Sequence, residues 1–142
     1  MAGISDLFTV LQKIRSTAQN LSKDVDPADS REETGGDLND LTSGFAQLQT
    51  LFQSLNQSDM QKIQAEVKEL MSGQQNFREY ARDVNALLAE VRNRTQQNKE
   101  MKKKIKKNIP VEHKNKDPDD FFGGLKGILD EVSSWSEKVA SK

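Results

Sequence analysis

The chain has 142 residues, of which 34% are hydrophobic and 30% charged, and its mean hydropathy is -0.79. A globular enzyme of this length usually draws about 45 to 50% of its residues from the apolar types, because it must fill a thick core around an enclosed cleft. The lower apolar content of this chain favours an assembly of helices that each bury only one stripe. The lack of Cys excludes disulfides and thiolate metal sites, and a single His excludes a metal site made of several histidines.

The formal net charge of -1 conceals an uneven distribution of charge. Between Arg92 and Lys116 ten basic residues face two acidic ones, a local charge of +8, which leaves -9 for the rest of the chain. The segment 24–40 holds seven acidic residues and one Arg, a local charge of -6. The chain is therefore electrically polar along its sequence.

The first predicted helix covers residues 3–23. Its apolar residues recur at steps of three and four, a spacing that puts them on one stripe of an amphipathic helix: Ile4, Leu7, Leu11, Ile14, Ala18 and Leu21. Residues 24–36 follow as an acidic flexible linker, marked by Pro27 and the pair Gly35-Gly36.

The segment 37–107 is predicted to form a helical hairpin or coiled coil with a basic end. The same three-four spacing appears in 37–56 and again from residue 60 to 91, which is the heptad seam of a coiled coil. Between Leu55 and Met60 the step is five, and Ser58 with Gln61 has the form of a capping box, so we expect a break there. The alternative is one continuous helix over 37–107.

Beyond Val91 the seam weakens. Thr95, Asn98 and Lys102 occupy positions where Leu or Val stood earlier, and Ile105 returns to the pattern. We expect this end either to project as a basic arm or to be covered by the first helix, the last helix or another chain.

A polar connector over 108–116 contains Pro110, and the last predicted helix covers 117–141. Asp117 is the predicted N-cap and Pro118 the first helical residue. Three glycines would allow another helix to approach closely: Gly123, Gly124 and Gly127. Together these segments predict an all-α fold: an elongated helical bundle or coiled coil in which one long helix, about 58–107, forms an antiparallel hairpin with 37–56, flanked by amphipathic N- and C-terminal helices.

The sequence shows no catalytic constellation. His113 lies in a charged connector without a second group to make it a base, and neither the glycine pairs nor the Asp117–Asp120 run has the spacing of a phosphate loop or an EF-hand. We therefore expect no enzyme, no cofactor and no metal site.

The leading functional hypothesis is a non-enzymatic structural or adaptor subunit. It would act through coiled-coil association with other helical chains, of its own or another kind. The predicted protein interface consists of seam residues from the long and last helices: Phe77, Val84, Leu88, Val91, Phe121, Leu125, Ile128 and Trp135.

The Lys-rich run offers a surface for an anionic partner. On a helix, five lysines share one broad face: Lys99, Lys102, Lys103, Lys106 and Lys107. Cations at a helix C-terminus that only complement its dipole are the alternative explanation. The absence of interleaved aromatics makes nucleic acid an unfavoured partner.

The run and the aromatic C-terminal helix together give the alternative function of a peripheral membrane-surface protein. We expect a cytoplasmic protein, because the sequence shows no signal peptide and no run of about 20 apolar residues that could cross a membrane.

Overall fold

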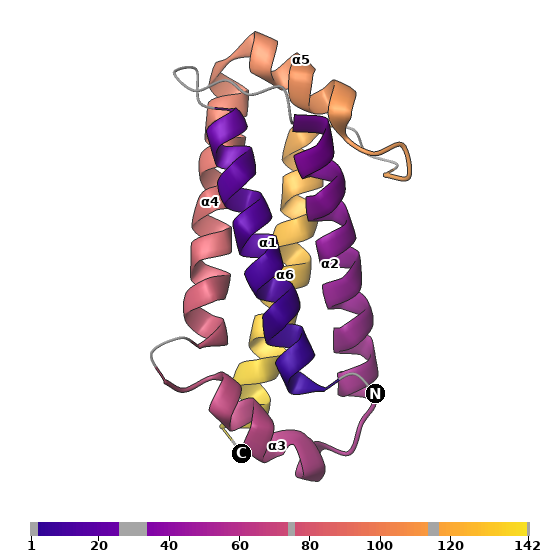
Figure 1. Ribbon diagram of the computed structural model, residues 1–142, viewed down its shortest axis with the longest axis vertical. Coiled ribbons are helices and arrows are strands. Elements are labelled where there is room, and N and C mark those ends of the chain that lie inside the picture. Colours follow the sequence, from indigo (N-terminus) through magenta and orange to yellow (C-terminus); the bar gives the residue numbers. More distant parts are fainter. Residues whose placement is uncertain (1–2, 26–33, 74–75, 114–116, 142) are drawn as a thin grey trace.

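Apolar stripes of helical period dictate the fold. The computed structural model describes residues 3–25, 34–73, 76–113 and 117–141, and these form six helices and no strand, so the all-α prediction is confirmed. The helices, shown in Figure 1, are α1 (Ile4–Asp24), α2 (Thr34–Asn56), α3 (Met60–Leu70), α4 (Phe77–Gln97), α5 (Lys99–Asn108) and α6 (Pro118–Ala140). Most of the predicted linker lies outside the described residues, and α2 already begins at Thr34, within its predicted range.

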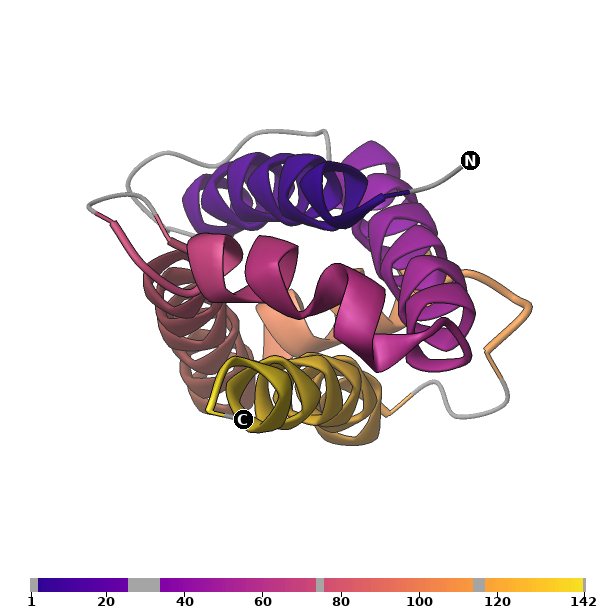
Figure 2. The same ribbon diagram turned by 90° about the horizontal axis from the view of Figure 1, so that it is seen from below.

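Four helices stand side by side and two short ones cross the ends of the bundle (Figures 1 and 2). The packed neighbours are α1 with α2 and α4, and α6 with α4 and α2. Consequently α2 and α4 occupy opposite corners, as Figure 2 shows. Helix α3 crosses one end and contacts α1 and α6, and α5 crosses the other end and contacts α2, α4 and α6.

The prediction of one long helix over 58–107, paired as a hairpin with 37–56, is wrong. The first interruption follows α3, where Gly73 adopts φ +92°, a left-handed conformation that side chains other than glycine rarely adopt. Asn76 then caps α4, because its side-chain oxygen accepts a hydrogen bond from the Glu79 N–H at 2.9 Å. The intervening α3 carries the chain across the bundle end, so α4 starts at the corner opposite α2.

Asn98 makes the second interruption. Its backbone is extended (φ -131°, ψ 110°), and its side-chain oxygen accepts hydrogen bonds from the Glu100 and Met101 N–H groups at 3.0 and 3.2 Å. The chain therefore turns sharply between α4 and α5. The basic end neither projects nor needs a second chain for cover, because Met101, Ile105 and Ile109 are buried against the bundle.

The predicted break after residue 56 is present, but its cap differs from the expected one. Asp59 is the N-cap of α3 and accepts a hydrogen bond from the Gln61 N–H at 3.0 Å. Ser58, the expected cap, instead donates its hydroxyl to the Ser54 carbonyl at 3.0 Å. At α6 the expected cap is the observed one, since Asp117 accepts a hydrogen bond from the Asp119 N–H at 2.9 Å.

One apolar core fills the bundle, and α1 and α2 approach each other closely at Gly44. A Cβ placed on Gly44 would lie 2.8 Å from Cγ1 of Ile14, so glycine is needed for this contact. Gly123, Gly124 and Gly127 mediate no close approach within this chain, because no atom outside their own helix lies within 4 Å of a Cβ at any of them and all three are exposed. An approach by a helix of another chain stays a prediction. Figure 1 also shows that no described helix stands apart from the bundle.

Candidate interaction surfaces

The residues predicted to form a protein interface lie in the core of this one chain. On α4 and α6, which pack together, seven of them are buried, with exposed fractions of 9% or less, and Ile128 is half-buried. The seven are Phe77, Val84, Leu88, Val91, Phe121, Leu125 and Trp135. A second chain could reach these side chains only if the bundle opened, so the predicted interface stays a prediction.

The aromatic side chains of α6 are also used inside the molecule. Trp135 packs edge-on against Phe52 with ring centroids 5.7 Å apart, and Phe121 packs in the same manner against Phe122 at 5.3 Å. These three α6 aromatics are buried. In this conformation none of them is free to anchor the chain in a membrane.

The lysine face is the predicted surface that the structure leaves accessible. We use this name for Lys99, Lys102, Lys103, Lys106 and Lys107, which are all exposed on α5. Met101 and Ile105 on the opposite side of the helix face the bundle and fix this orientation. In the described part of the chain no carboxylate lies within ion-pair distance of these five lysines.

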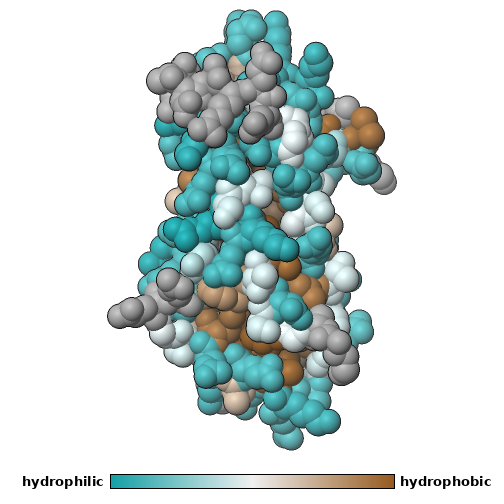
Figure 3. All heavy atoms as spheres, in the orientation of Figure 1, coloured by the Kyte–Doolittle hydropathy of each residue, from teal (hydrophilic) through white to brown (hydrophobic). Residues whose placement is uncertain are grey.

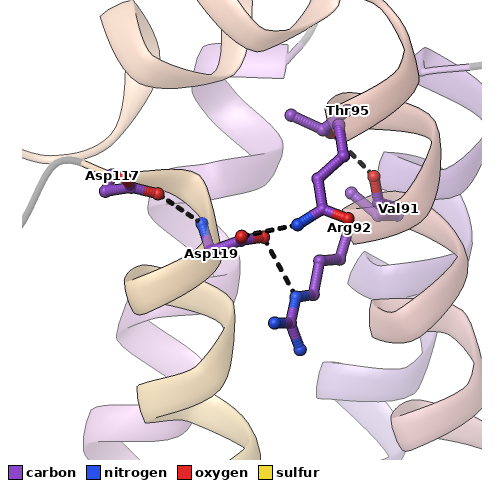
Figure 4. A network of polar contacts seen from close by, with 6 residues as sticks. Val91, Arg92, Thr95, Asp117 and Asp119 are labelled. Carbon is purple, nitrogen blue, oxygen red and sulfur yellow. Dashed lines mark hydrogen bonds and ion pairs between the residues drawn. The ribbon is translucent and has the colours of Figure 1, made fainter.

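A polar network holds α4 to α6 next to the lysine face (Figure 4). Arg92 Nε donates to Asp119 Oδ1 at 3.0 Å, and Gln96 Nε2 donates to the other carboxylate oxygen. The hydrogen bond from Arg92 is the main reason that the pKa of Asp119 lies below its ordinary value. Desolvation opposes this shift, while the bond from Gln96 and the charges of Arg92 and Lys102 add to it. The Asp119 charge is therefore engaged by groups of its own chain.

Apolar side chains gather on a different surface. Figure 3 shows them on the face that α1 and α2 present, in the half of the molecule away from α5. A shallow groove between these helices is lined in part by Val10, Ala46 and Leu51. Beside it, on the α4 side, Phe8 and Tyr80 stack edge-on at 5.0 Å, and the Arg15 guanidinium lies 4.7 Å from the centre of the Tyr80 ring.

The residues described here bring together no metal-ligating cluster. No three of their His, Cys, Asp and Glu side chains are placed to hold a metal ion. His113 is half-buried, and its ring packs edge-on against Phe121 at 5.0 Å. The grooves found on the same residues are open surface features, and none of the helices they form is long and apolar enough to cross a membrane.

Val111 is a surface residue that the sequence analysis missed. It is 80% exposed, and it is the one large apolar side chain that is mostly exposed in the described segments. The available signal was its position between Pro110 and Glu112, outside every apolar stripe.

The bundle defines the chain as an all-α protein with a closed core and a basic end. Searches of protein families, of curated proteins and of solved structures found no match to it.

Proposed function

We propose that this chain is a non-enzymatic adaptor or structural subunit that binds a polyanionic partner through the lysine face of α5. The observation that supports the proposal is the orientation of α5. Its apolar side is used in covering the bundle, and five lysines point away from the molecule.

Repulsion among the lysines of this face destabilises the folded chain. Lys99 with Lys103, Lys102 with Lys106, and Lys103 with Lys107 are like charges four residues apart, which destabilise a helix by about 0.2 to 0.5 kcal/mol per pair. A polyanion on this face would replace repulsion with attraction.

The helix dipole does not account for these lysines. Lys106 and Lys107 lie in the last turn of α5, where a cation is favourable. Lys99, however, is the first residue of the helix, where a cation is unfavourable, and Lys102 and Lys103 lie between the two end turns, where the dipole has little effect. The alternative of charges placed only to complement a helix C-terminus therefore explains part of the face and not the whole.

Association with other helical chains is a second candidate function. The observation that favours it is the groove between α1 and α2, which is lined in part by the exposed Ala46 and the half-buried Leu51. This mode differs from the coiled-coil seam predicted from the sequence, because it uses the outside of a closed bundle.

Heparin chromatography tests the polyanion proposal. We expect the wild-type chain to bind at low salt despite its net charge of -1, and Lys103→Glu/Lys107→Glu to elute at a clearly lower salt concentration. The matched control is Lys62→Glu/Lys68→Glu, which changes the net charge equally but on α3, at the opposite end of the bundle. Equal elution of the two variants, or failure of the wild type to bind, would contradict the proposal. Far-UV circular dichroism verifies that both variants fold.

A further inference from the structure

We infer that the polyanion is an anionic lipid bilayer, which the α5 end of the bundle meets with the lysine face on the headgroups and Val111 at the headgroup boundary. This inference rests on the proposed function and specifies its partner. Two features of the α5 end carry it: the arrangement of the lysines and the exposed valine that follows them.

The lysine face suits a broad, flat partner. Because α5 lies across the end of the bundle, its outward side forms the end of the molecule (Figure 1). From Lys99 to Lys107 the helix rises about 12 Å, so the five ammonium groups share one small area. Mobile anionic headgroups can gather under such an area without matching a fixed phosphate spacing.

The absence of certain side chains from α5 disfavours nucleic acid as the partner. Every basic residue of the helix is Lys, and the helix contains no aromatic residue. Arg forks and aromatic rings are the groups that read or stack on bases, and lysine supplies only a point charge.

Val111 distinguishes a bilayer from other polyanions. The chain leaves α5 through Ile109, which is buried, and Pro110, which is half-buried, and then exposes 80% of Val111 to solvent. An apolar side chain gains free energy by entering the headgroup and acyl boundary of a membrane. It gains nothing from a sulfate or phosphate backbone.

The binding should be shallow and sensitive to salt. The apolar side of α5 is occupied by the bundle, so the helix cannot insert as a free amphipathic helix does. Four exposed carboxylates at the same end oppose adsorption, those of Glu100, Glu112, Asp117 and Asp120, whereas Asp119 is paired with Arg92. Electrostatic attraction therefore has to supply most of the affinity, and it weakens as salt is added.

Vesicle sedimentation with the full chain tests the inference. We expect binding to phosphatidylcholine vesicles that contain phosphatidylserine, no binding to phosphatidylcholine alone, and release by salt. Neutralising one lysine should weaken binding about fivefold, so Lys103→Glu/Lys107→Glu should weaken it by about 25-fold or more. The control Lys62→Glu/Lys68→Glu should bind nearly as the wild type does.

Val111→Ser separates the lipid inference from the general polyanion proposal. It should weaken vesicle binding about threefold to tenfold and leave elution from heparin unchanged. Unaltered vesicle binding would overturn the role given to Val111.

A gel shift with duplex DNA is the third binding experiment, beside heparin chromatography and vesicle sedimentation. Binding to heparin or DNA without binding to anionic vesicles would overturn the lipid inference and leave the proposed function standing. Failure with all three probes would overturn both.

Discussion

At the residue scale, Asp119 shows how a polar contact at the surface positions the α5 end. Its carboxylate accepts hydrogen bonds from Arg92 and Gln96 on α4, while its backbone N–H donates to the capping Asp117. Because the bond from Arg92 favours the charged form, the pKa of Asp119 lies below its ordinary value in the folded state. The ionised carboxylate therefore stabilises the fold above the ordinary pKa of an aspartate, about 4, and this contribution is lost as pH falls through the lowered value.

Asp119→Asn should lower the thermal unfolding midpoint near neutral pH by at most a few degrees, because exposed ion pairs contribute little. The difference from the wild type should vanish at acidic pH, once the wild-type carboxyl is itself protonated. Asp120→Asn is the control: Asp120 is exposed in the same first turn of α6, and no described residue pairs with its carboxylate. Thermal denaturation at several pH values checks this prediction. A penalty for Asp119→Asn that is the same at every pH would contradict it.

At the element scale, α1 and α2 depend on one glycine for their contact. Gly44 lies in a helix interior, where glycine is disfavoured by about 1 kcal/mol relative to alanine. A Cβ there would lie 2.8 Å from Cγ1 of Ile14, which is inside contact distance and in the middle of a buried side chain. The gain in helix propensity from an alanine is therefore set against overpacking, which costs about 1 to 3 kcal/mol.

Gly44→Ala should lower the free energy of unfolding, by up to about 2 kcal/mol after the two terms are combined. Gly127→Ala is the matched control, because Gly127 lies inside α6 with no atom of another element within 4 Å of its Cβ position. This control should raise stability by about 0.5 to 1 kcal/mol. Urea denaturation measures both, and a stabilising Gly44→Ala would show that Ile14 moves aside at little cost.

The elements could be predicted from the sequence where a long apolar stripe lies between clear breaks. Helices α1, α2 and α6 follow this rule, and their stripes become the core. The break at Gly73 was missed because a short turn there interrupts a strong apolar pattern, and the break at Asn98 was missed because the pattern was already weak and a single residue makes the turn. The seam positions of a continuous helix would be Asn98, Lys102 and Ile105, of which the first two are polar, but the buried residues after the turn are Met101, Ile105 and Ile109. Covering the bundle end with these three side chains outweighs helix continuity.

At the scale of the whole molecule, the sequence predicted which residues are buried and which are accessible better than it predicted what covers the buried ones. Leu88 and Val91 were predicted to be buried by helices, and a heptad seam looks the same whether the covering helix belongs to the same chain or to another. The lysine face was predicted to be accessible because charge resists burial, and this part of the candidate surface is exposed in the structure. Val111 lies outside every apolar stripe, which is the sequence signal for its exposure, and the extent of that exposure comes from the fold.

The closed core makes a prediction about the solution behaviour of the chain. Seam residues such as Leu88 and Trp135 are covered within one chain, so folding should not require a second copy. The thermal unfolding midpoint, followed by far-UV circular dichroism, should then stay constant as the protein concentration is varied about a hundredfold. An assembly in which chains share their seams would unfold at higher temperature as concentration rises, because dissociation accompanies unfolding.

Leu88→Asp distinguishes the same two arrangements. A charge buried in a core shared by α4 and α6 should abolish cooperative unfolding of the single chain. If Leu88 serves an interface between chains instead, the variant should remain helical and only its mass in light scattering should fall. A midpoint that rises with concentration, together with a folded Leu88→Asp monomer, would show that the seams join different chains.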